Sequence, residues 1–369
     1  MKKAILSVTN DLVSDQRLNR TAITLSKCGY KVLLVGRKLP DSINYIGDFE
    51  FVRLNLLFKK GPLFYAEYNL RLFCLLFFRK ADLFYANDLD SLPANFLASS
   101  FHGNLLIYDS HEYFTGVPEL NNRKFVSSIW KNMEKFLLPR IKYKITVSNS
   151  VANQYYCDYK VNMQVIRNLP FKQLNFKKAD LNLEGKKVVV YQGALNIHRG
   201  IEHVIKAFKY LENFVFIVVG NGDIEKELKD LSINEGVSDK IIFTGKIHFF
   251  ELPEYTNLAD VGISLEEDTN LNYRFALPNK LFDYIQAEVP VLVSELPEMA
   301  SLVRKYGVGE VCVNRSPKEI ASQIREIANN RERYLLKLKE AANELCWENE
   351  SKKLIDLISS FSEQSKVQQ

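Results

Sequence analysis

The sequence predicts an α/β protein built from two doubly wound domains. Its 369 residues exceed what one ordinary hydrophobic core accommodates. Short β-rich runs alternate with longer helical patterns along the chain, which is typical of parallel sheets covered by helices on both faces. A polar stretch after Asn168-Leu169-Pro170 interrupts this alternation. We therefore expect an amino-terminal domain over residues 1–170, a carboxyl-terminal domain over residues 171–345, and a final helical segment over residues 346–369.

The composition is that of a globular protein in a reducing compartment. Apolar residues make up 47% of the chain and charged residues 25%. No apolar run approaches the roughly 20 residues that span a bilayer, and the first apolar stretch ends at Val8, too early for a secretory signal. The five cysteines are scattered, and no pair has the spacing of a metal or redox site. We expect a cytoplasmic protein without a metal ion or other cofactor.

The positive charge is concentrated in the first half. Residues 1–170 hold 23 Lys and Arg against 14 Asp and Glu, whereas the rest of the chain is net negative. A basic domain indicates an anionic partner such as a phosphorylated acceptor or the inner face of a membrane, and we expect no nucleic acid. The alternative interpretation is a surface of solvated lysines.

The expected elements follow one another in regular alternation. Strands are predicted at residues 4–8, 31–35, 51–56, 82–85, 105–108, 144–147, 164–166, 188–192, 214–219, 240–244, 261–264, 291–293 and 309–313. Helices are predicted at residues 15–27, 63–78, 91–101, 123–138, 150–156, 200–211, 223–234, 251–257, 317–329, 331–345 and 347–361, with one more beginning at Pro278. Ligands of such folds bind at the carboxyl ends of the strands and between the domains.

The segment from Leu277 to Tyr284 is the strongest candidate for a binding site. Pro278 suits the first turn of a helix and Asn279 is a good capping residue, so a helix should begin here. Its free N–H groups and dipole would attract an anion, and Lys280 adds a full charge. Asp283, one turn later, could accept hydrogen bonds from a sugar hydroxyl, so the segment suits a nucleotide. The alternative is an ordinary helix packed on a strand.

Glycines and cations also follow the other predicted strands of this domain. Gly193 ends its first strand, and Arg199-Gly200 open the next helix. Gly220-Asn221-Gly222 ends the second strand, where the absence of side chains would let backbone approach a ligand. Ile247, after the third strand, lies where a flat base could pack. Arginine suits phosphate because its planar guanidinium group can donate two parallel hydrogen bonds to phosphate oxygens.

Several motifs together resemble family 4 glycosyltransferases of the bacterial surface-polysaccharide type. In the second domain they are Tyr191-Gln192-Gly193, Arg199-Gly200, Val219-Gly220-Asn221-Gly222, Phe243-Thr244-Gly245 and Leu277 to Tyr284. In the first domain they are Asn87 to Pro93, Tyr108 to Glu112, Thr146 to Ser150 and Val165 to Asn168. The resemblance implies the GT-B fold, in which two Rossmann-like domains face each other across a cleft and the final helix returns to brace the first domain.

The resemblance also implies an activity. It is the transfer of a sugar from a UDP- or GDP-sugar donor to a hydroxyl of a glycan or lipid-linked acceptor, with retention at the anomeric carbon and without a metal. Arg199, Lys280 and the helix start would stabilise the leaving diphosphate, and His111 would lie against the donor sugar. The expected donor-binding residues are Gly193, Gly220, Gly222, Ile247, Glu267, Leu277, Pro278, Asn279, Leu281 and Asp283.

The sequence departs from the family pattern in two places. The first of the family's paired glutamates would fall on Phe275, so Glu266 or Glu267 is expected to substitute, or the contact is absent. The usual glycine-rich first loop is here Thr9-Asn10-Asp11. The expected acceptor-side residues are Asn10, Asp11, Asp88 and Glu112. Asp88 and Asp90 resemble a metal-binding pair, but we expect Asp88 near the acceptor and Asp90 as a helix cap.

The apolar segment from Lys59 to Lys80 has two interpretations. It is either an interfacial segment that meets a membrane or a crossover helix buried on the sheet. Burial is favoured because the segment lies between two predicted strands.

Two other functions share the expected fold. One is a sugar-nucleotide 2-epimerase, which needs no acceptor. The other is a non-catalytic subunit that binds a nucleotide sugar, suggested by Phe275 and by the missing glycines of the first loop. A nicotinamide dehydrogenase is disfavoured because no G-x-G-x-x-G follows the first strand.

Overall fold

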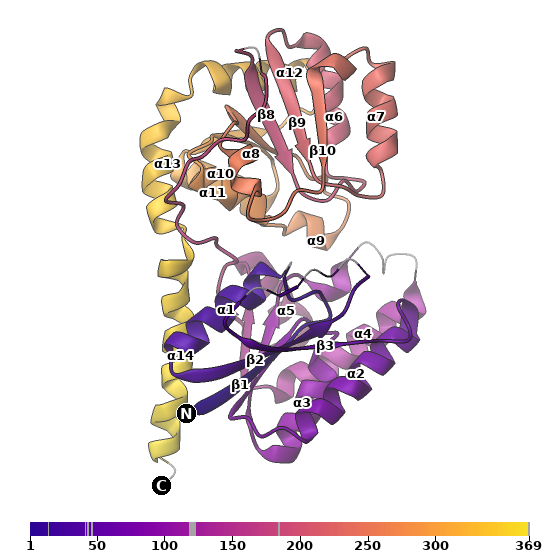
Figure 1. Ribbon diagram of the computed structural model, residues 1–369, viewed down its shortest axis with the longest axis vertical. Helices are drawn as coiled ribbons and strands as arrows, with labels where there is room; N and C mark the ends of the chain where they lie inside the picture. Colours follow the sequence, from indigo (N-terminus) through magenta and orange to yellow (C-terminus); the bar gives the residue numbers. More distant parts are fainter. Residues whose placement is uncertain are drawn as a thin grey trace. The chain divides into compact units, whose positions relative to one another are not determined.

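The computed structural model divides the chain into two compact units (Figure 1). It describes residues 1–13, 15–40, 42, 44–45, 47–117, 123–183 and 185–367, with side chains as far as residue 361. Unit 1 comprises Met1–Asn168 and Glu350–Gln369, and unit 2 comprises Leu169–Asn349. None of the helices in these described ranges is long and apolar enough to cross a bilayer.

Unit 1 is built on a parallel sheet in the strand order β3-β2-β1-β4-β5-β6-β7. The strands are β1 (Lys2–Ser7), β2 (Tyr30–Arg37), β3 (Glu50–Leu54), β4 (Leu83–Asn87), β5 (Leu105–Ser110), β6 (Tyr143–Thr146) and β7 (Gln164–Val165). All were predicted, with ends shifted by a residue or two. The central strands are buried along nearly their whole length, as expected for a sheet covered on both faces.

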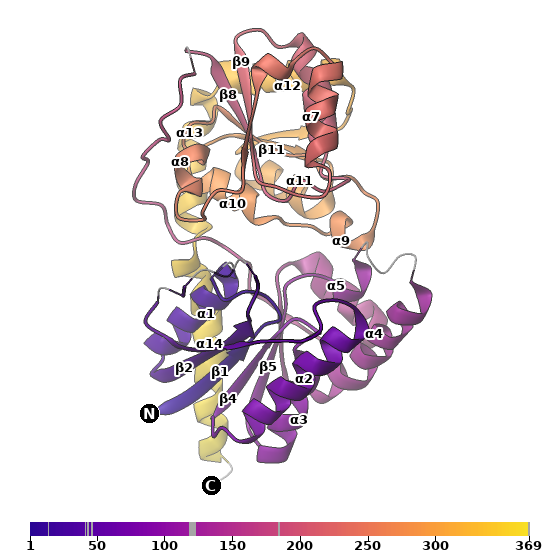
Figure 2. The ribbon, with the colours of Figure 1, turned by 45° about the vertical axis from the view of Figure 1, so that its right-hand side comes forward.

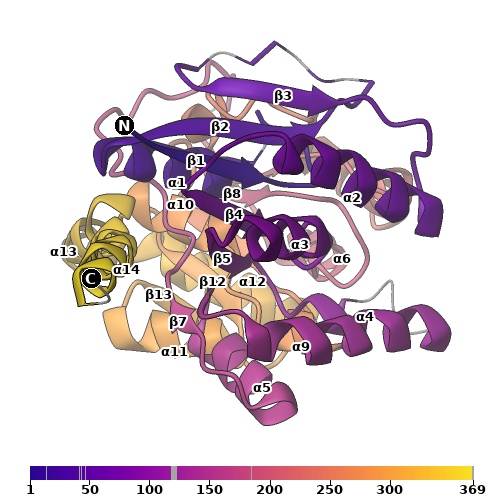
Figure 3. The same cartoon turned by 90° about the horizontal axis from the view of Figure 1, so that it is seen from below.

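Helices cover both faces of this sheet. They are α1 (Gln16–Lys27), α2 (Gly61–Phe77), α3 (Leu92–His102), η1 (Phe114–Gly116), α4 (Lys124–Leu137), η3 (Leu138–Arg140) and α5 (Asn149–Tyr159). The strand order runs in one direction from β3 to β6, so right-handed crossovers place α2, α3 and α4 on one side. The connection from β1 to β2 runs the other way, and α1 lies on the opposite side (Figures 1 and 3).

Helix α2 is a crossover helix, as favoured from the sequence. Phe64, Tyr68, Leu72 and Leu76 recur every four residues and are buried against the unit. The burial is one-sided, because Leu63 and other apolar residues of the segment remain exposed.

Unit 2 contains a second parallel sheet, in the order β10-β9-β8-β11-β12-β13 (Figure 2). Its strands are β8 (Lys187–Gln192), β9 (Phe214–Val219), β10 (Ile241–Gly245), β11 (Val261–Ser264), β12 (Val291–Ser294) and β13 (Gly309–Cys312). The order reverses direction between β8 and β11, which is the topological switch point where doubly wound sheets bind ligands.

The helices of unit 2 differ from prediction in three respects. They are α6 (Ile201–Ala207), η4 (Phe208–Tyr210), α7 (Glu225–Asn234), η5 (Ser238–Lys240), α8 (Leu252–Thr256), α9 (Leu271–Arg274), α10 (Asn279–Gln286), α11 (Pro297–Tyr306), α12 (Pro317–Asn329) and α13 (Glu332–Glu344). Helices α9 and α11 were not predicted, although Pro297 and the left-handed Gly307 mark the ends of α11. Helix α10 has Pro278 at its N-cap, so Asn279 is its first residue and not its cap.

The last helix, α14 (Trp347–Val367), packs on unit 1 from Glu350 onward. The side chain of Glu350 accepts a hydrogen bond from the backbone N–H of Arg167 at 2.8 Å. The ring of Phe361 lies 4.4 Å from that of Tyr143 in β6. Leu354 is fully buried, whereas its neighbour Ile355 is 36% exposed.

Truncating Leu354 should therefore destabilise unit 1 much more than truncating its neighbour. We expect Leu354→Ala to lower the free energy of unfolding by about 2–5 kcal/mol, because it leaves a cavity in the core. Ile355→Ala should cost no more than about 1 kcal/mol. Denaturant unfolding followed by the fluorescence of the two tryptophans measures both; equal losses would contradict the assigned packing of α14.

Candidate functional site

Three charged side chains of unit 2 converge at the start of α10. Lys280, in the first turn of α10, places Nζ 2.6 Å from Oε1 of Glu266, which follows β11. Arg199, just before α6, brings its guanidinium to 3.7 Å from the same oxygen. Glu266 is fully buried and Lys280 is 7% exposed. The sequence predicted the two cations at this edge of the sheet, and the structure brings them onto one carboxylate.

Aromatic rings support both cations. Nζ of Lys280 lies 4.1 Å from the centre of the Tyr191 ring, and the Arg199 guanidinium lies 4.8 Å from the Tyr273 ring. Such contacts stabilise a partly desolvated cation. Nε of Arg199 is buried and has no hydrogen-bond partner within the described residues. The Arg199 side chain as a whole is 26% exposed, so an anion can reach it.

The electrostatics leave this cluster with excess positive charge. Burial alone would raise the pKa of Glu266, but the charges of Lys280 and Arg199 lower it below its usual value. Burial and repulsion from Arg199 lower the pKa of Lys280, although Glu266 opposes both. Two cations share one anion at the amino end of a helix, where the dipole also favours negative charge. The arrangement suits a phosphate group.

Arg315, which the sequence analysis did not single out, fixes the chain on either side of Glu266. Its guanidinium donates to the carbonyl of Leu265 at 3.2 Å and also to the carbonyl of Glu266. The latter accepts a second hydrogen bond from Ser294 at 2.6 Å. Ser264 donates to the carboxylate of Glu266 at 2.7 Å. The buried carboxylate is therefore held in one position.

Asp283 is oriented by a buried glutamine. Nε2 of Gln192, at the end of β8, donates to Asp283 at 2.9 Å. The hydroxyl of Thr256 donates to Oε1 of Gln192 at 2.7 Å, which fixes which way the amide points. Gln192 is 3% exposed, and Asp283 is half-buried. The Asp283 carboxylate is therefore held in one orientation.

Glu267 binds two histidines. His198 donates to Oε2 at 2.8 Å and His203 to Oε1 at 2.9 Å. Burial opposes charge on Glu267, but these hydrogen bonds and the nearby histidines lower its pKa. The hydrogen bond from His198 to Glu267 also fixes the position of residue 198, whose backbone is left-handed (φ 66°) and directly precedes Arg199. Glu267 therefore supports the loop that carries Arg199.

The two glycines after β9 are required by backbone packing. A Cβ at Gly220, where φ is 138°, would lie 1.9 Å from the carbonyl oxygen of Gly193. A Cβ at Gly222 would lie 2.4 Å from that of Leu195. These glycines allow the turns after β8 and β9 to pack closely together. The sequence analysis had explained them by the approach of a ligand to the backbone.

The other predicted donor-binding residues surround the same strand ends. Pro278 is half-buried, and Asn279 is exposed at the first position of α10. Leu277 and Ile247 are partly buried against the core. Leu281 is fully buried, and its N–H donates to the carbonyl of Pro278 at 3.1 Å. The side chain of Leu281 is therefore a core residue.

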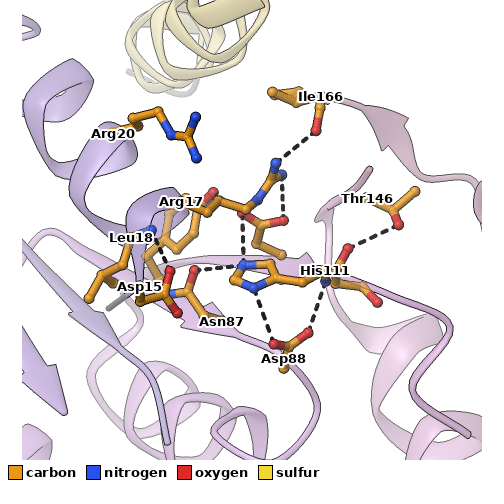
Figure 4. A network of polar contacts seen from close by, with 12 residues as sticks. Asp15, Arg17, Leu18, Arg20, Asn87, Asp88, His111, Thr146 and Ile166 are labelled. Carbon is orange, nitrogen blue, oxygen red and sulfur yellow. Dashed lines mark hydrogen bonds and ion pairs between the residues drawn. The ribbon is translucent and has the colours of Figure 1, made fainter. Parts of the chain in front are cut away.

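In unit 1, His111 lies at the centre of a polar network (Figure 4). Its Nδ1 is 3.2 Å from Oδ2 of Asp88, and its backbone N–H donates to the same carboxylate at 2.8 Å. Its Nε2 lies 3.2 Å from Oδ1 of Asn87, whose Nδ2 donates to the carbonyl of Ser7. Both ring nitrogens thus face acceptors, so the geometry favours the doubly protonated, cationic imidazole.

A buried ion pair stands behind His111. Arg17 forms a bidentate ion pair with Asp109, in which two guanidinium nitrogens donate to the two carboxylate oxygens at 2.8 and 2.7 Å. It also donates to the carbonyl of Ile166 at 3.0 Å. Tyr85 donates to Asp109 at 2.6 Å. Burial opposes the charge of Asp109, but Arg17 and His111 hold its pKa well below the usual range. Neither Arg17 nor Asp109 was predicted as part of a site.

These neighbours determine the protonation of His111. Burial alone would lower its pKa, but the charge of Asp88 and the hydrogen bond and charge of Asp109 raise it to about 9. The imidazole is therefore a cation at neutral pH. It can donate hydrogen bonds and stabilise negative charge, but it is a poor general base.

The predicted acceptor-side residues have different surroundings. Asn10 is exposed and Glu112 is half-buried. Asp11 is 6% exposed, with hydrogen bonds from the N–H of Val13 at 2.9 Å and from Arg53 at 3.4 Å. Its carboxylate therefore stabilises the first loop.

Asp88 and Asp90 have separate partners. Asp88 holds His111 and adopts a left-handed backbone, φ 60°. Asp90 accepts a hydrogen bond from Thr9 and does not cap α3, whose N-cap is Ser91. Burial raises the pKa of Asp90 to about 7. The prediction that Asp90 caps a helix was wrong. In the described ranges, no three His, Cys, Asp or Glu side chains are arranged so that they could hold a metal ion.

Two doubly wound parallel-sheet units and a helix that returns to the first unit define the GT-B fold. Residues 173–345 match the family model for "Glycosyl transferases group 1". The matched segment is a glycosyltransferase domain, and the candidate anion site lies inside it.

Individual relatives agree with this classification. An uncharacterized glycosyltransferase of Methanocaldococcus jannaschii is 26% identical over 155 residues, which cover 41% of this chain and 38% of that protein. The match thus spans less than half the length of that relative.

Solved structures share the fold over nearly the whole chain. Sucrose-phosphate synthase from Thermosynechococcus elongatus has a TM-score of 0.80 at 16% identity, covering 99% of this chain and 100% of that one. The Anabaena protein HepE, solved in complex with UDP, has a TM-score of 0.71 at 15% identity, covering 98% and 100%.

The cationic state of His111 predicts a specific pH dependence of stability. Its pKa is raised on folding, so its contribution is complete below about pH 6.5 and is lost as the pH rises through about 9. The loss should be at most about 3 kcal/mol. His111→Gln should lack this loss while keeping the other pH effects. Unfolding free energies between about pH 6 and pH 10 measure it; a wild-type-to-variant difference that is constant with pH would refute the assignment.

Proposed function

We propose that the protein is a glycosyltransferase that moves a sugar from a UDP- or GDP-sugar to a hydroxyl of a glycan or lipid-linked acceptor. The transfer retains the anomeric configuration and serves surface-polysaccharide synthesis, as in the family 4 enzymes that the sequence resembles. The group 1 domain supports the donor class, and the HepE–UDP complex shows that a protein of this fold binds a nucleoside diphosphate. The observation that carries the proposal is the convergence of Arg199 and Lys280 on Glu266.

Charge stabilisation is the main chemical task that we assign to this cluster. When the bond between the anomeric carbon and the phosphate oxygen breaks, negative charge develops on the leaving diphosphate. Arg199, Lys280 and the first turn of α10 supply fixed positive charge for it, and preorganised charge of this kind lowers the barrier without reorganisation. Glu266 keeps the two cations in place while no substrate is bound. We expect no metal ion to be needed.

The mechanism that we propose is a front-face displacement. The acceptor hydroxyl attacks on the face that the diphosphate leaves, and a phosphate oxygen of the leaving group takes the acceptor proton. His111 lies against the donor sugar and stabilises negative charge there through its own positive charge. Its two ring N–H groups are engaged by Asp88 and Asn87, and the cationic ring has no lone pair with which to accept a proton. Asn10, Asp88 and Glu112 remain candidates for the acceptor side; Asp11 contributes through the shape of its loop.

For donor recognition, we assign the ribose hydroxyls to Asp283. The amide of Gln192 occupies one carboxylate oxygen and directs the group. Ile247, Leu277, Pro278 and Asn279 would surround the base and the phosphates.

We further propose that the enzyme works in the cytoplasm, in contact with the inner face of a membrane through the basic first half of the chain. The charge of residues 1–170 supports this proposal. The free state of all five cysteines is compatible with a reducing compartment.

Removing the Arg199 charge should mainly affect turnover. We expect Arg199→Ala to lower kcat about 100-fold or more, as for loss of one transition-state donor, and Arg199→Lys to recover part of the loss. Release of UDP or GDP from a panel of donor sugars, with and without acceptor, measures turnover and identifies an epimerase or a non-catalytic binder. Arg304→Ala, at an exposed arginine of α11, is the matched control. Wild-type turnover in Arg199→Ala would overturn the phosphate assignment.

Lys280 needs a compensated variant, because its removal leaves Glu266 buried without its closest cation. Lys280→Met alone should lower the free energy of unfolding by about 3–5 kcal/mol. It should also lower turnover. Lys280→Met with Glu266→Gln should recover much of the stability but not the turnover. Recovery of both would show that Lys280 has only a structural role.

Gln192 provides a test specific to the ribose. We expect Gln192→Leu to weaken binding of UDP or GDP by about tenfold, the effect of one misplaced charge-assisted hydrogen bond. Binding of the corresponding 2′,3′-dideoxynucleoside diphosphate should not change. Titration calorimetry compares both ligands, with Gln323→Leu as the control. If the variant bound both ligands more weakly by the same factor, the effect of Gln192 would not act through the ribose hydroxyls.

A further inference from the structure

One side of unit 1 exposes an unusual number of large apolar side chains. They lie on α2, α3 and α4 and at the residue that ends α2: Leu63, Leu70, Phe78, Leu97, Phe101, Phe125, Ile129 and Phe136. We call this surface the three-helix face. Phe78 and Phe125 are the most exposed of the set, at 82% and 78%. Single exposed apolar residues are ordinary, but a group shared by neighbouring helices marks an interaction surface.

The three helices form one continuous layer. The rings of Phe77 in α2 and Phe101 in α3 are 4.6 Å apart, and those of Tyr65 in α2 and Trp130 in α4 are 5.0 Å apart. Figure 3 shows the three helices on the same side of the sheet, away from α1 and α14.

Helix α4 carries two apolar stripes. Trp130 and Leu137 face inward and are buried. Phe125, Ile129 and Phe136 are exposed, and at 100° per residue they fall within about 40° of one another around the helix axis. A helix that only covers a sheet needs one apolar stripe. Among the described residues, the second stripe takes no part in the packing of unit 1.

The charges around this face are almost all positive. Residues 57–80 and 123–142 contain eleven Lys and Arg but only two acidic residues, Glu67 and Glu134. Glu67 pairs with Arg71, and Glu134 is buried beneath hydrogen bonds from Thr115 and Tyr155. Helix α3 contains no Asp, Glu, Lys or Arg.

The lysines of α4 also have a consistent position. Lys124, Lys131 and Lys135 fall within about 40° of one another, in a row beside the exposed stripe. All three are exposed. A helix with an apolar stripe bordered by lysines is typical of segments that lie in the interface of an anionic bilayer.

We propose that the three-helix face docks on the surface of a bilayer that contains anionic phospholipid. The aromatic and aliphatic side chains enter the boundary between headgroups and acyl chains, and the surrounding lysines and arginines contact anionic headgroups. A second copy of this chain fits less well, because a symmetric contact would oppose two faces of the same positive sign.

The orientation of α4 connects this face with the proposed activity. A helix that links two parallel strands begins at the carboxyl edge of the sheet, so Phe125 marks the end of the stripe nearest that edge. Trp130 contacts Phe114 at 5.1 Å, three residues beyond His111. If the proposed transfer to a lipid-linked acceptor is correct, docking would bring the acceptor's membrane to the edge that holds His111. The docking itself requires no substrate.

Vesicle binding tests the proposal independently of catalysis. Full-length protein is sedimented with vesicles of phosphatidylcholine, or of phosphatidylcholine with about 30% phosphatidylglycerol, at low and high salt. We expect binding to the anionic vesicles to be at least tenfold tighter than to the neutral ones, and to weaken as salt rises. Retention of the wild type in the supernatant, or equal binding to both vesicles, would overturn the proposal.

Two variants separate the apolar and the electrostatic parts. Phe125→Ser with Phe136→Ser, and Lys124→Gln with Lys131→Gln and Lys135→Gln, should each weaken binding about tenfold or more. The matched controls lie on unit 2, at exposed residues: Ile233→Ser with Leu336→Ser, and Lys226→Gln with Lys318→Gln and Lys337→Gln. They should bind like the wild type. Circular dichroism checks that each variant is folded.

A direct readout locates the contact. The fluorescence emission maximum of the Phe125→Trp variant should shift to the blue when anionic vesicles are added. That of the Ile233→Trp variant should not shift. Wild-type binding by the α4 variants, or equal losses in the unit 2 controls, would refute the assignment of this face. Concentration-dependent dimerisation that the Phe125 and Phe136 variant abolishes, without vesicle binding, would assign the face to a second copy of the chain.

Discussion

The candidate site of unit 2 depends on the burial of one carboxylate. A buried ionised glutamate is strongly unfavourable unless opposite charge and hydrogen bonds surround it. Glu266 has both, from Lys280, Arg199 and Ser264. Because two cations meet this single anion, the cluster is held together and still carries positive charge. The same interaction therefore fixes the geometry of the site and leaves it able to receive an anionic group.

The architecture could be predicted from sequence because strand and helix patterns are local. The alternation gave every strand of both sheets, and the rule that ligands meet strand ends brought Arg199 and Lys280 to one edge. Helix α11 was missed, although Pro297 and Gly307 mark its ends. The start of α10 was displaced by one residue, since Pro278 and Asn279 both suit the first positions of a helix.

The partners of the site residues could not be predicted, because they are set by long-range packing. Glu266 and Glu267 are adjacent in the sequence just after β11, but their side chains have different partners. One is buried with the cations and the other binds His198 and His203, and nothing in the sequence distinguishes them. Asp11 was likewise expected to face a ligand, but Arg53, distant in sequence, engages it. Gln192 was part of a recognised motif, yet its hydrogen bond to Asp283 required the fold.

The contact between Gly220 and the carbonyl of Gly193 affects how variation at these positions should be understood. Any side chain at residue 220 would displace the neighbouring turn and with it the start of the Arg199 loop. In a survey of all single replacements, residues 220 and 222 would tolerate almost nothing, even if no ligand atom ever came near them. Intolerance there reports on how closely two turns of main chain can approach, whereas the tolerance of Arg199 and Asp283 reports on chemistry.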